Sequence, residues 1–455
     1  MEIDAPWLAT RLRARSIRGI AQEVSALIRA GAIPAGTQLP PVRDLAAALR
    51  VSPATVSAAW SDLRRFNAIT GRGRTGMKVS GDPIAPRPAR FGRSRFGRGG
   101  HFAPDVIDLS VASPDPALLP PLGAALRAAE AAPRLHSYIR EPILPTLRAA
   151  VAPRWAYAAD AYLATNGGYD GVHMALQALL MPGSLVAVEE PTAARLLDLL
   201  EAAGATPLPV ACDAEGPRPD ELAAALCRKP AAFLFQPRTH AATGHVVTPA
   251  RLAALEAALR GHDTLVIEDD GIGDLSRAPP ASLGAAFPSR VVHIRSFSKT
   301  LGPDFRLAVL SAPPDLVDRI QAFRSFGVGW TSRILQAAAA ALLTDPATDA
   351  IIAHARATYA TRRRTLLAAL ATRGLHLPDQ DGLAIWLPVR TEQVALVTLA
   401  AHTIAVMPGS NYLIRPTAHV RVATSLLRDR VDEVADALAL VHADAPSKEG
   451  KVFFW

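Results

Sequence analysis

The chain has little cysteine, no long apolar run and no basic, apolar leader at its start. Cys212 and Cys227 are the only cysteines among 455 residues. Their spacing matches no metal-binding motif, so we expect buried thiols rather than a disulfide or a metal site. No apolar stretch approaches the roughly 20 residues of a membrane helix. Residues 1–4 lack the features of a secretory signal, so we expect the protein to stay in the cytoplasm.

Acidic residues are scarce in the first hundred positions. Residues 1–80 carry 12 Lys and Arg against 5 Asp and Glu, and residues 81–104 carry 5 against 1. The rest of the chain is nearly balanced, so the net charge of +8 comes from the amino-terminal part. A basic amino-terminal part followed by a nearly neutral remainder indicates that the amino-terminal part binds a polyanion. The length predicts two or three domains.

The first 80 residues have the pattern of three helices followed by a hairpin. Apolar side chains fall on one helical face in residues 16–30, and a second helix is expected at 42–49. Ser52 is a good N-cap for a third helix over residues 53–66. Residues 69–79 form two short strand-like runs around a Gly/Arg tip. This order of elements predicts a winged helix-turn-helix domain.

A helix-turn-helix places its second helix in the major groove, while nearby cations contact phosphates. The predicted DNA-contacting residues are Arg43 before the turn, Ser52, Thr55 and Ser57 near the start of the recognition helix, and Arg72, Arg74 and Lys78 in the wing. The alternative is a protein-interaction module of the same shape. The Gly-Arg-Gly-Arg wing favours DNA, because its cations suit a backbone or a minor groove.

Residues 35–46, 51–56 and 71–76 resemble the GntR family of bacterial regulators. The resemblance implies that residues 1–80 bind a double-stranded DNA operator. The family usually carries Arg or another polar residue where this chain has Pro53, so one direct DNA contact of the relatives is expected to be missing here.

Beyond residue 80, the sequence consists of a basic linker followed by a region in which strand-like and helical stretches alternate. Residues 81–104 are rich in Pro, Gly and Arg without an apolar period, which predicts an extended linker. In residues 105–455, apolar strand-like runs alternate with Ala/Leu-rich helical stretches. This alternation predicts an α/β fold with a mostly parallel sheet. We expect a large part over about 155–350 and a small α+β subdomain over about 351–455.

Lys299 lies between two serines just after an apolar run, with Arg306 seven positions further on. A lysine can form a Schiff base with an aldehyde, and Ser296, Ser298 and Arg306 can hold a phosphate dianion. Pyridoxal 5′-phosphate (PLP) requires both groups at once. We therefore predict Lys299 as the Schiff-base lysine of a PLP site.

Further features stand in the order found in fold-type I PLP enzymes, which this region resembles. Gly167 and Gly168 precede a helix whose first N–H groups could cradle phosphate. Asp269 ends a strand, where its carboxylate can keep a pyridine nitrogen protonated. The resemblance implies Arg421 as an effector-carboxylate ligand and Tyr138 as a phosphate ligand from the partner subunit. Taken singly, Asp269 could be a cap, Arg421 a surface charge and the glycines an ordinary turn.

The whole arrangement resembles the MocR-type subfamily of GntR regulators: a fold-type I, PLP-dependent aminotransferase-like domain preceded by a winged helix-turn-helix domain. The resemblance implies PLP as cofactor, PLP or an amino compound as effector, and a head-to-tail, domain-swapped homodimer. Residues 300–308 look most like the branch associated with vitamin B6 metabolism.

Three departures from the family pattern lie around the expected cofactor ring. Ala241 stands where relatives have the Asn that bonds the phenolic oxygen, Gly271 replaces an aromatic residue, and Ala193 replaces a tyrosine. We therefore expect a site that holds PLP but transaminates poorly, in a PLP-responsive regulator. The alternatives are an active aminotransferase localised by its winged helix and a PLP-free dimerisation scaffold.

Overall fold

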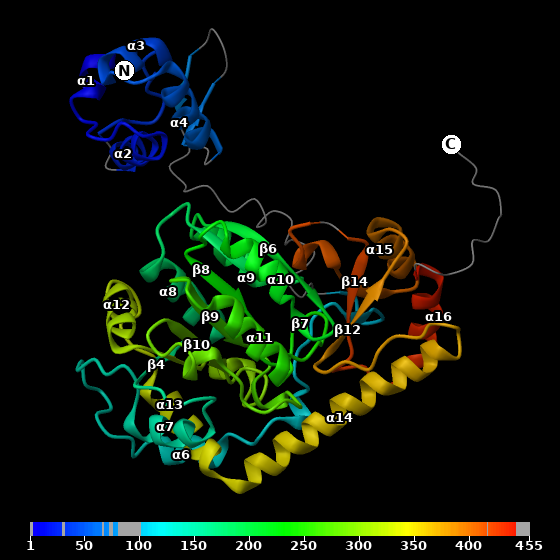
Figure 1. Ribbon diagram of the computed structural model, residues 1–455. Helices are drawn as coiled ribbons and strands as arrows, with labels where there is room; N and C mark the ends of the chain where they lie inside the picture. Colours follow the sequence, from blue (N-terminus) through cyan, green and yellow to red (C-terminus); the bar gives the residue numbers. More distant parts are fainter. Residues whose placement is uncertain are drawn as a thin grey trace, which may run out of the picture. The chain divides into compact units, whose positions relative to one another are not determined.

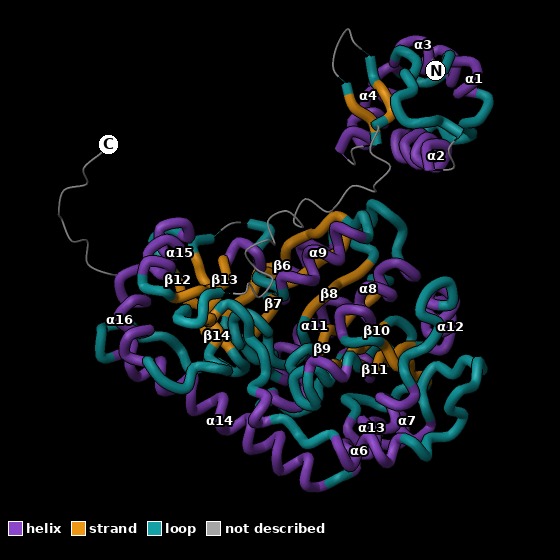
Figure 2. The backbone as a smooth tube through the Cα atoms, turned by 180° about the vertical axis from the view of Figure 1, so that it is seen from behind, coloured by secondary structure: helices purple, strands orange, loops and turns teal. Residues whose placement is uncertain are grey.

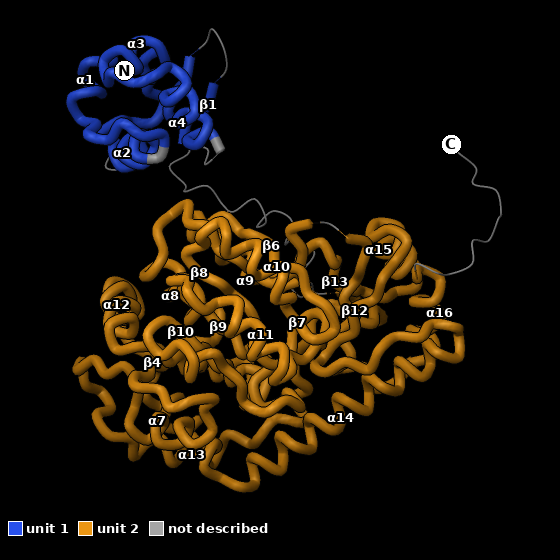
Figure 3. Tube along the Cα trace, viewed as in Figure 1, with its two compact units in different colours: residues 1–92 blue, residues 93–455 orange. Residues whose placement is uncertain are grey.

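A computed structural model describes residues 3–29, 32–65, 68–71, 76–80, 102–415 and 417–442. The chain divides into two compact units, residues 1–92 and residues 93–455 (Figure 3). Each unit has a buried apolar core of its own, as expected for separate domains.

The amino-terminal unit packs helices around a core that includes Leu45, Val56 and Trp60 (Figure 1). Asp4 begins the first helix, since its side chain accepts the N–H of Trp7 at 2.8 Å. Its described elements are α1 (Ala5–Ala9), α2 (Ile17–Arg29), α3 (Val42–Leu49), α4 (Pro53–Arg65), β1 (Ile69–Thr70) and β2 (Lys78–Val79). The two strands pair antiparallel.

The helices predicted for this unit are confirmed, and one was missed. Ser52 caps α4, because its Oγ accepts the N–H of Thr55 at 3.1 Å. Helix α1 was not predicted because five residues are too few to show a helical period. The wing tip with Arg72 and Arg74 lies outside the described residues.

The second unit is built on an eight-stranded sheet in the order β4-β11-β10-β9-β8-β5-β6-β7. The run from β10 to β6 is parallel, and β11 is antiparallel to both of its neighbours. The prediction of a mostly parallel sheet is confirmed. The strands are β4 (Ala161–Thr165), β5 (Leu185–Glu190), β6 (Thr206–Asp213), β7 (Gly216–Pro217), β8 (Ala232–Phe235), β9 (Leu265–Asp270), β10 (Val291–Ser296) and β11 (Ala308–Ala312).

Helices cover both faces of this sheet (Figure 2). Alternate side chains of one strand enter different cores: Leu234 packs with α8, α9 and α12, whereas Phe233 packs with α10 and α11. Helices α6, α7 and α13 cover the β4–β11 end on the second face. Their bounds are α6 (Gly123–Ala129), α7 (Pro145–Val151), α8 (Gly168–Leu179), α9 (Ala194–Ala202), α10 (Pro219–Leu226), α11 (Pro249–Leu259), α12 (Pro314–Arg324) and α13 (Arg333–Thr344).

A smaller four-stranded sheet forms the carboxy-terminal subdomain, in the order β12-β14-β13-β3. The 26-residue helix α14 leads to it from the large part (Figure 1). Strand β3 comes from the start of the unit and pairs parallel with β13, which the sequence did not predict. The elements are β3 (Ile107–Leu109), α14 (Pro346–Ala371), β12 (Ala384–Pro388), α15 (Glu392–Ala401), β13 (Ile404–Pro408), β14 (His419–Ala423) and α16 (Val431–Val441).

None of the helices that the structure describes is long and apolar enough to cross a membrane.

Candidate functional site

The candidate site forms where the parallel strands β9 and β10 end side by side. Ile294 on β10 is in register with Asp269 on β9, so both strands reach the same edge of the sheet. Asp269 lies at the end of β9, and Ser296 ends β10 three residues before Lys299. The carboxyl edge of parallel strands is where α/β folds commonly bind ligands.

Lys299 is half-buried, and its Nζ donates a hydrogen bond to the carbonyl oxygen of Ala112. Burial, together with the positive charge of Arg421, lowers the pKa of this amine to about 8. Both effects disfavour the ammonium form. Near neutral pH, Lys299 is therefore uncharged and nucleophilic far more often than an ordinary lysine.

Two adjacent aspartates at the end of β9 have opposite environments. Asp269 is 2% exposed, and its Oδ2 accepts one hydrogen bond, from Nε2 of Gln236 at 3.1 Å. Burial, together with the charge of Asp270, raises the pKa of Asp269 to about 7. Burial also acts on Asp270, but the ion pair with Arg238, 2.6 Å between NH2 and Oδ2, keeps its pKa below the usual value.

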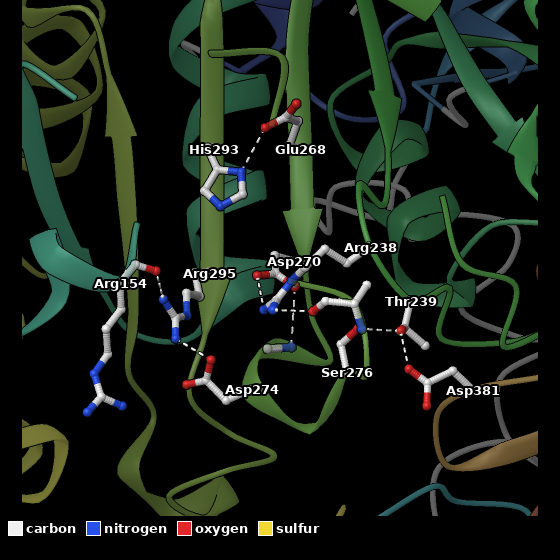
Figure 4. Close-up of polar contacts among 12 residues, drawn as sticks. Arg154, Arg238, Thr239, Glu268, Asp270, Asp274, Ser276, His293, Arg295 and Asp381 are labelled. Carbon is white, nitrogen blue, oxygen red and sulfur yellow. Dashed lines mark hydrogen bonds and ion pairs between the residues drawn. The ribbon is translucent and has the colours of Figure 1, made fainter. Parts of the chain in front are cut away.

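A polar network anchors the loops around these strand ends (Figure 4). The hydroxyl of Thr239 contacts Ser276 Oγ and donates to Asp381 Oδ2, both at 2.6 Å. Asp381 precedes β12, so the network ties the small subdomain to the large sheet. Deeper in the sheet, His293 Nδ1 lies 2.7 Å from Glu268. Asp270 is held within this network, while in the described part of the chain no cation pairs with Asp269.

The residues predicted to hold phosphate come together from three segments. Helix α8 begins at Gly168, after Gly167 adopts a φ of 103°, which disfavours other residues. A Cβ on Gly167 would lie 3.0 Å from the guanidinium of Arg306, and one on Gly168 would lie 3.2 Å from Cβ of Ser296. The N–H of Ser298 in turn donates to Ser296 Oγ at 3.3 Å. The two glycines therefore leave space beside Arg306 and Ser296, and these residues form a cationic cradle.

Arg421 lies on β14 with 8% of its surface exposed. Its NH2 donates to the carbonyl of Ser110 at 2.7 Å, and its guanidinium carbon lies 5.3 Å from the centre of the Tyr412 ring. Its Nε is buried without a hydrogen-bond partner among the described residues. Arg421 is therefore no surface charge, and it has a donor left for an anionic ligand.

Tyr138 is not brought to this cluster within one chain. It is 87% exposed and packs edge-on against Trp330, with ring centres 5.9 Å apart. The role predicted for it depends on a second subunit, which a single chain does not test.

Comparisons with known proteins agree with this geometry. Residues 104–438 match the family model "Aminotransferase class I and II", and residues 17–79 match "Bacterial regulatory proteins, gntR family". The vitamin B6 salvage pathway transcriptional repressor PtsJ of Salmonella typhimurium is 34% identical over 91% of this chain and 95% of its own length. The chain belongs to the MocR-type subfamily of GntR regulators.

Other relatives support the same assignment. The regulator TauR of Rhodobacter capsulatus is 30% identical over 85% of this chain and 87% of its own. The probable rhizopine catabolism regulatory protein MocR of Rhizobium meliloti is 26% identical over 85% and 81%. An aromatic aminotransferase of Pyrococcus horikoshii, 23% identical over 74% of this chain and 95% of its own, superposes with a TM-score of 0.67, which shows the fold.

The structure shows the surroundings of the three residues at which this MocR-type regulator differs from the family pattern. The backbone N–H of Ala241 donates to Gln236 Oε1 at 2.9 Å, but the residue offers no side-chain donor. A Cβ on Gly271 would lie 3.4 Å from Asp269 Oδ2, an ordinary contact, so a side chain could begin there without a clash. Ala193 is buried in the apolar core beside α9.

Of the predicted DNA-binding residues that the structure describes, Thr55 is half-buried and the others are exposed. Arg43 on α3, Ser57 on α4 and Lys78 on β2 face solvent. Ser52 and Thr55 bond each other, with 2.8 Å between their hydroxyl oxygens, at the start of α4. A helix N-terminus with exposed hydroxyls and nearby cations suits phosphate and base-edge contacts.

Sequence reasoning missed several groups in the site. Gln236 directly follows β8 at the same sheet edge as Asp269, and this position was a usable signal. Ser110 and Ala112 contribute only carbonyl oxygens, and Tyr412 lies in a short 3₁₀ turn, so no side-chain pattern pointed to them.

Proposed function

We propose that this protein regulates transcription in response to PLP, which it binds at Lys299. The observation that carries the proposal is that an amine with a lowered pKa and a buried carboxylate, paired with no cation among the described residues, lie at the same edge of the sheet. The GntR domain gives the chain a DNA-binding unit. The name of the Salmonella relative, a vitamin B6 salvage repressor, supports vitamin B6 as the signal.

The residues present fit PLP at both of its ends. The cradle of Gly167, Gly168, Ser296 and Arg306 would hold the phosphate, and the absence of side chains at the two glycines leaves space for it. At the other end, Asp269 would hold a protonated ring nitrogen. That nitrogen would supply the positive charge that the buried carboxylate lacks.

PLP, when bound, supplies an aldehyde that condenses with an amine. Lys299 with a pKa of about 8 is uncharged in about a quarter of molecules at pH 7.5, against roughly 0.1% for an ordinary lysine. Gln236 fixes the orientation of the Asp269 carboxyl through its 3.1 Å hydrogen bond. Arg421, with its unpartnered Nε, would hold the carboxylate of an amino-compound effector.

We further propose that the site transaminates slowly. Ala241 and Gly271 put no side-chain hydrogen-bond donor beside the expected phenolic oxygen, although Lys299 and Asp269 remain. A bound ligand would then act mainly by favouring one arrangement of the domains in the proposed homodimer. Such coupling requires that the ligand bind the two arrangements with different affinity.

DNA binding by the full-length protein tests the proposal. DNA fragments selected from a random pool would be titrated by fluorescence anisotropy with and without PLP. We expect PLP to change the affinity at least about tenfold in wild type and in the control Lys229→Ala, which removes an exposed lysine. The variant Lys299→Ala should not respond. An equal response in Lys299→Ala would contradict the proposal.

Three further measurements bear on the proposal and its alternatives. Arg43→Ala should weaken binding to all fragments alike, as loss of a phosphate contact does. If the protein takes up no PLP and borohydride reduction fixes no PLP to it, that result would favour the interpretation that this domain is a dimerisation scaffold. Rapid conversion of bound PLP to the pyridoxamine form with one of a panel of amino donors would instead favour an aminotransferase.

A further inference from the structure

Glu189, Cys212 and His245 converge at a second place near the carboxyl edge of the large sheet. Glu189 lies in β5, Cys212 in β6, and His245 in the loop that follows β8. One donor atom from each lies within 4.8 Å of the other two. Glu189 and His245 are 0% and 2% exposed, and Cys212 is partly buried. A carboxylate, a thiol and an imidazole are therefore held together inside the unit.

A hydrogen-bond relay fixes the tautomer of His245. Nδ1 of His240 accepts the backbone N–H of Thr243 at 3.1 Å, so that nitrogen carries no proton. The Thr243 hydroxyl lies 2.9 Å from His240 Nδ1 and 2.8 Å from His245 Nδ1. Both contacts are satisfied when the hydroxyl donates to His240 and accepts from His245. His245 then bears its proton on Nδ1 and a lone pair on Nε2, as metal-binding histidines do.

Two buried acceptor atoms in the cluster have no partner in the described part of the chain. They are Nε2 of His245 and Oε2 of Glu189. The other oxygen of Glu189 accepts the N–H of Gln236 at 2.9 Å, which fixes the carboxylate. Unsatisfied buried polar atoms are costly and uncommon. A cation placed between them would satisfy both.

The cluster also borders a cavity of about 240 Å³. Its lining includes Cys212, His245, Gln380 and Trp386. A Cβ on Gly216 would lie 3.4 Å from His245 Nε2, so with glycine no side chain packs against that nitrogen from this direction. The cavity gives an ion a route in and leaves room for a water molecule as a further ligand.

We propose that Glu189, Cys212 and His245 bind a thiophilic divalent cation, of which Zn²⁺ matches the donor set best. Thiolate, imidazole and carboxylate are its usual ligands, and hard cations avoid sulfur. Bonds to zinc would place the ligand atoms roughly 3.5 Å apart. The distances between these atoms would therefore shorten by up to about 1 Å on binding. On binding, the Cys212 thiol passes its proton to solvent. This site uses none of the residues proposed to bind PLP.

Zinc titration of chelator-treated, full-length protein tests the site. We expect wild type to bind one more Zn²⁺ per chain than Cys212→Ser or His245→Ala does. Cys227→Ser is the matched control, because Cys227 is the other cysteine and is exposed. It should bind zinc as wild type does. Equal zinc uptake by wild type and Cys212→Ser would overturn the proposal.

A second measurement does not depend on altering the buried cluster. In the Cys227→Ser protein, Cys212 is the only thiol. Zinc should slow its reaction with a chromogenic aromatic disulfide at least about tenfold, because a bound thiolate is a poorer nucleophile. Cobalt(II) in place of zinc should give a thiolate-to-metal absorption band. Unchanged thiol reactivity together with no cobalt–thiolate band would overturn the proposal.

Thr243 acts here as a positioning residue. Thr243→Val removes the hydroxyl that orients His245, and we expect zinc affinity to fall about 10-fold, as for other residues that orient a metal ligand. Thr243→Ser keeps the hydroxyl and should restore binding. Equal zinc affinity in the two variants would contradict the relay.

Discussion

The two sides of the Lys299 pocket differ in how completely they are equipped. On the side proposed for the phosphate and the ring nitrogen, Gly167 leaves space beside Arg306, and Asp269 accepts a hydrogen bond from Gln236. On the opposite side, Ala241 and Gly271 contribute no side-chain donor. The protein has the groups proposed to bind the cofactor and lacks the groups expected to tune the cofactor's reactivity.

This difference teaches that binding and catalysis are separable in one fold. Interactions that hold the cofactor equally in all states give affinity, whereas rate depends on interactions that strengthen in the transition state. A regulator needs the first kind. The pocket is therefore consistent with a sensor built on an aminotransferase fold.

Among the groups proposed to bind PLP, the partner of the ring nitrogen should have the largest effect on PLP affinity when it is removed. Asp269→Asn should weaken PLP binding about 100-fold, since losing one partner of a buried charge pair costs roughly 3 kcal/mol. Absorbance titration would measure the affinity, with the exposed Asp263→Asn as control. An affinity equal to that of the control would show that Asp269 does not hold the ring.

Filling the phosphate cradle should have the next largest effect. Gly167→Ala puts a Cβ 3.0 Å from Arg306 and forces alanine into a φ of 103°. We expect PLP affinity to fall about 30-fold, because a charged hydrogen bond worth about 2 kcal/mol is displaced. Gly261→Ala is the matched control, since its φ of 79° gives similar strain but nothing lies within 4 Å. Equal losses in both variants would indicate strain alone.

Adding hydrogen-bond donors at positions 241 and 271 should increase the rate of the half-reaction with amino donors. Ala241→Asn combined with Gly271→Tyr adds two donors beside the expected phenolic oxygen, and Gly271 has room for a Cβ. We expect the half-reaction with amino donors to speed up about tenfold, the value of one additional hydrogen bond. Single-turnover absorbance would measure it, and adding Lys299→Ala should abolish it. An unchanged rate would mean that these groups do not limit catalysis.

The pH dependence of PLP capture should show the smallest change. Only the uncharged amine attacks an aldehyde, so the rate should rise with pH, with a midpoint near pH 8, the pKa of Lys299, and level off above it. Arg421→Leu removes a charge that disfavours the ammonium and should move the midpoint upward. The shift should stay below about one unit, because burial is the larger cause. Stopped-flow absorbance would measure both midpoints, and a downward shift would contradict this assignment.

Several parts of the site were predictable because they follow strand ends or helix starts. Asp269, Ser296 and Gly168 each adjoin an apolar run whose length and period are visible in the chain, and parallel strands bring such ends to one edge. Gln236 obeys the same rule and was overlooked. The contributions of Ser110 and Ala112 were not predictable, because a backbone carbonyl leaves no mark on residue type.

The sequence by itself determined the winged helix-turn-helix, the α/β body and the segment around Lys299, because local periodicity and short spacing specify them. Tertiary structure alone decided that Asp270 is paired with Arg238 while Asp269 pairs with no cation among the described residues. It also decided that Glu189, Cys212 and His245 meet, although their spacing in the chain matches no motif. Burial and sheet order control these outcomes, since they place residues far apart in sequence within a few ångströms.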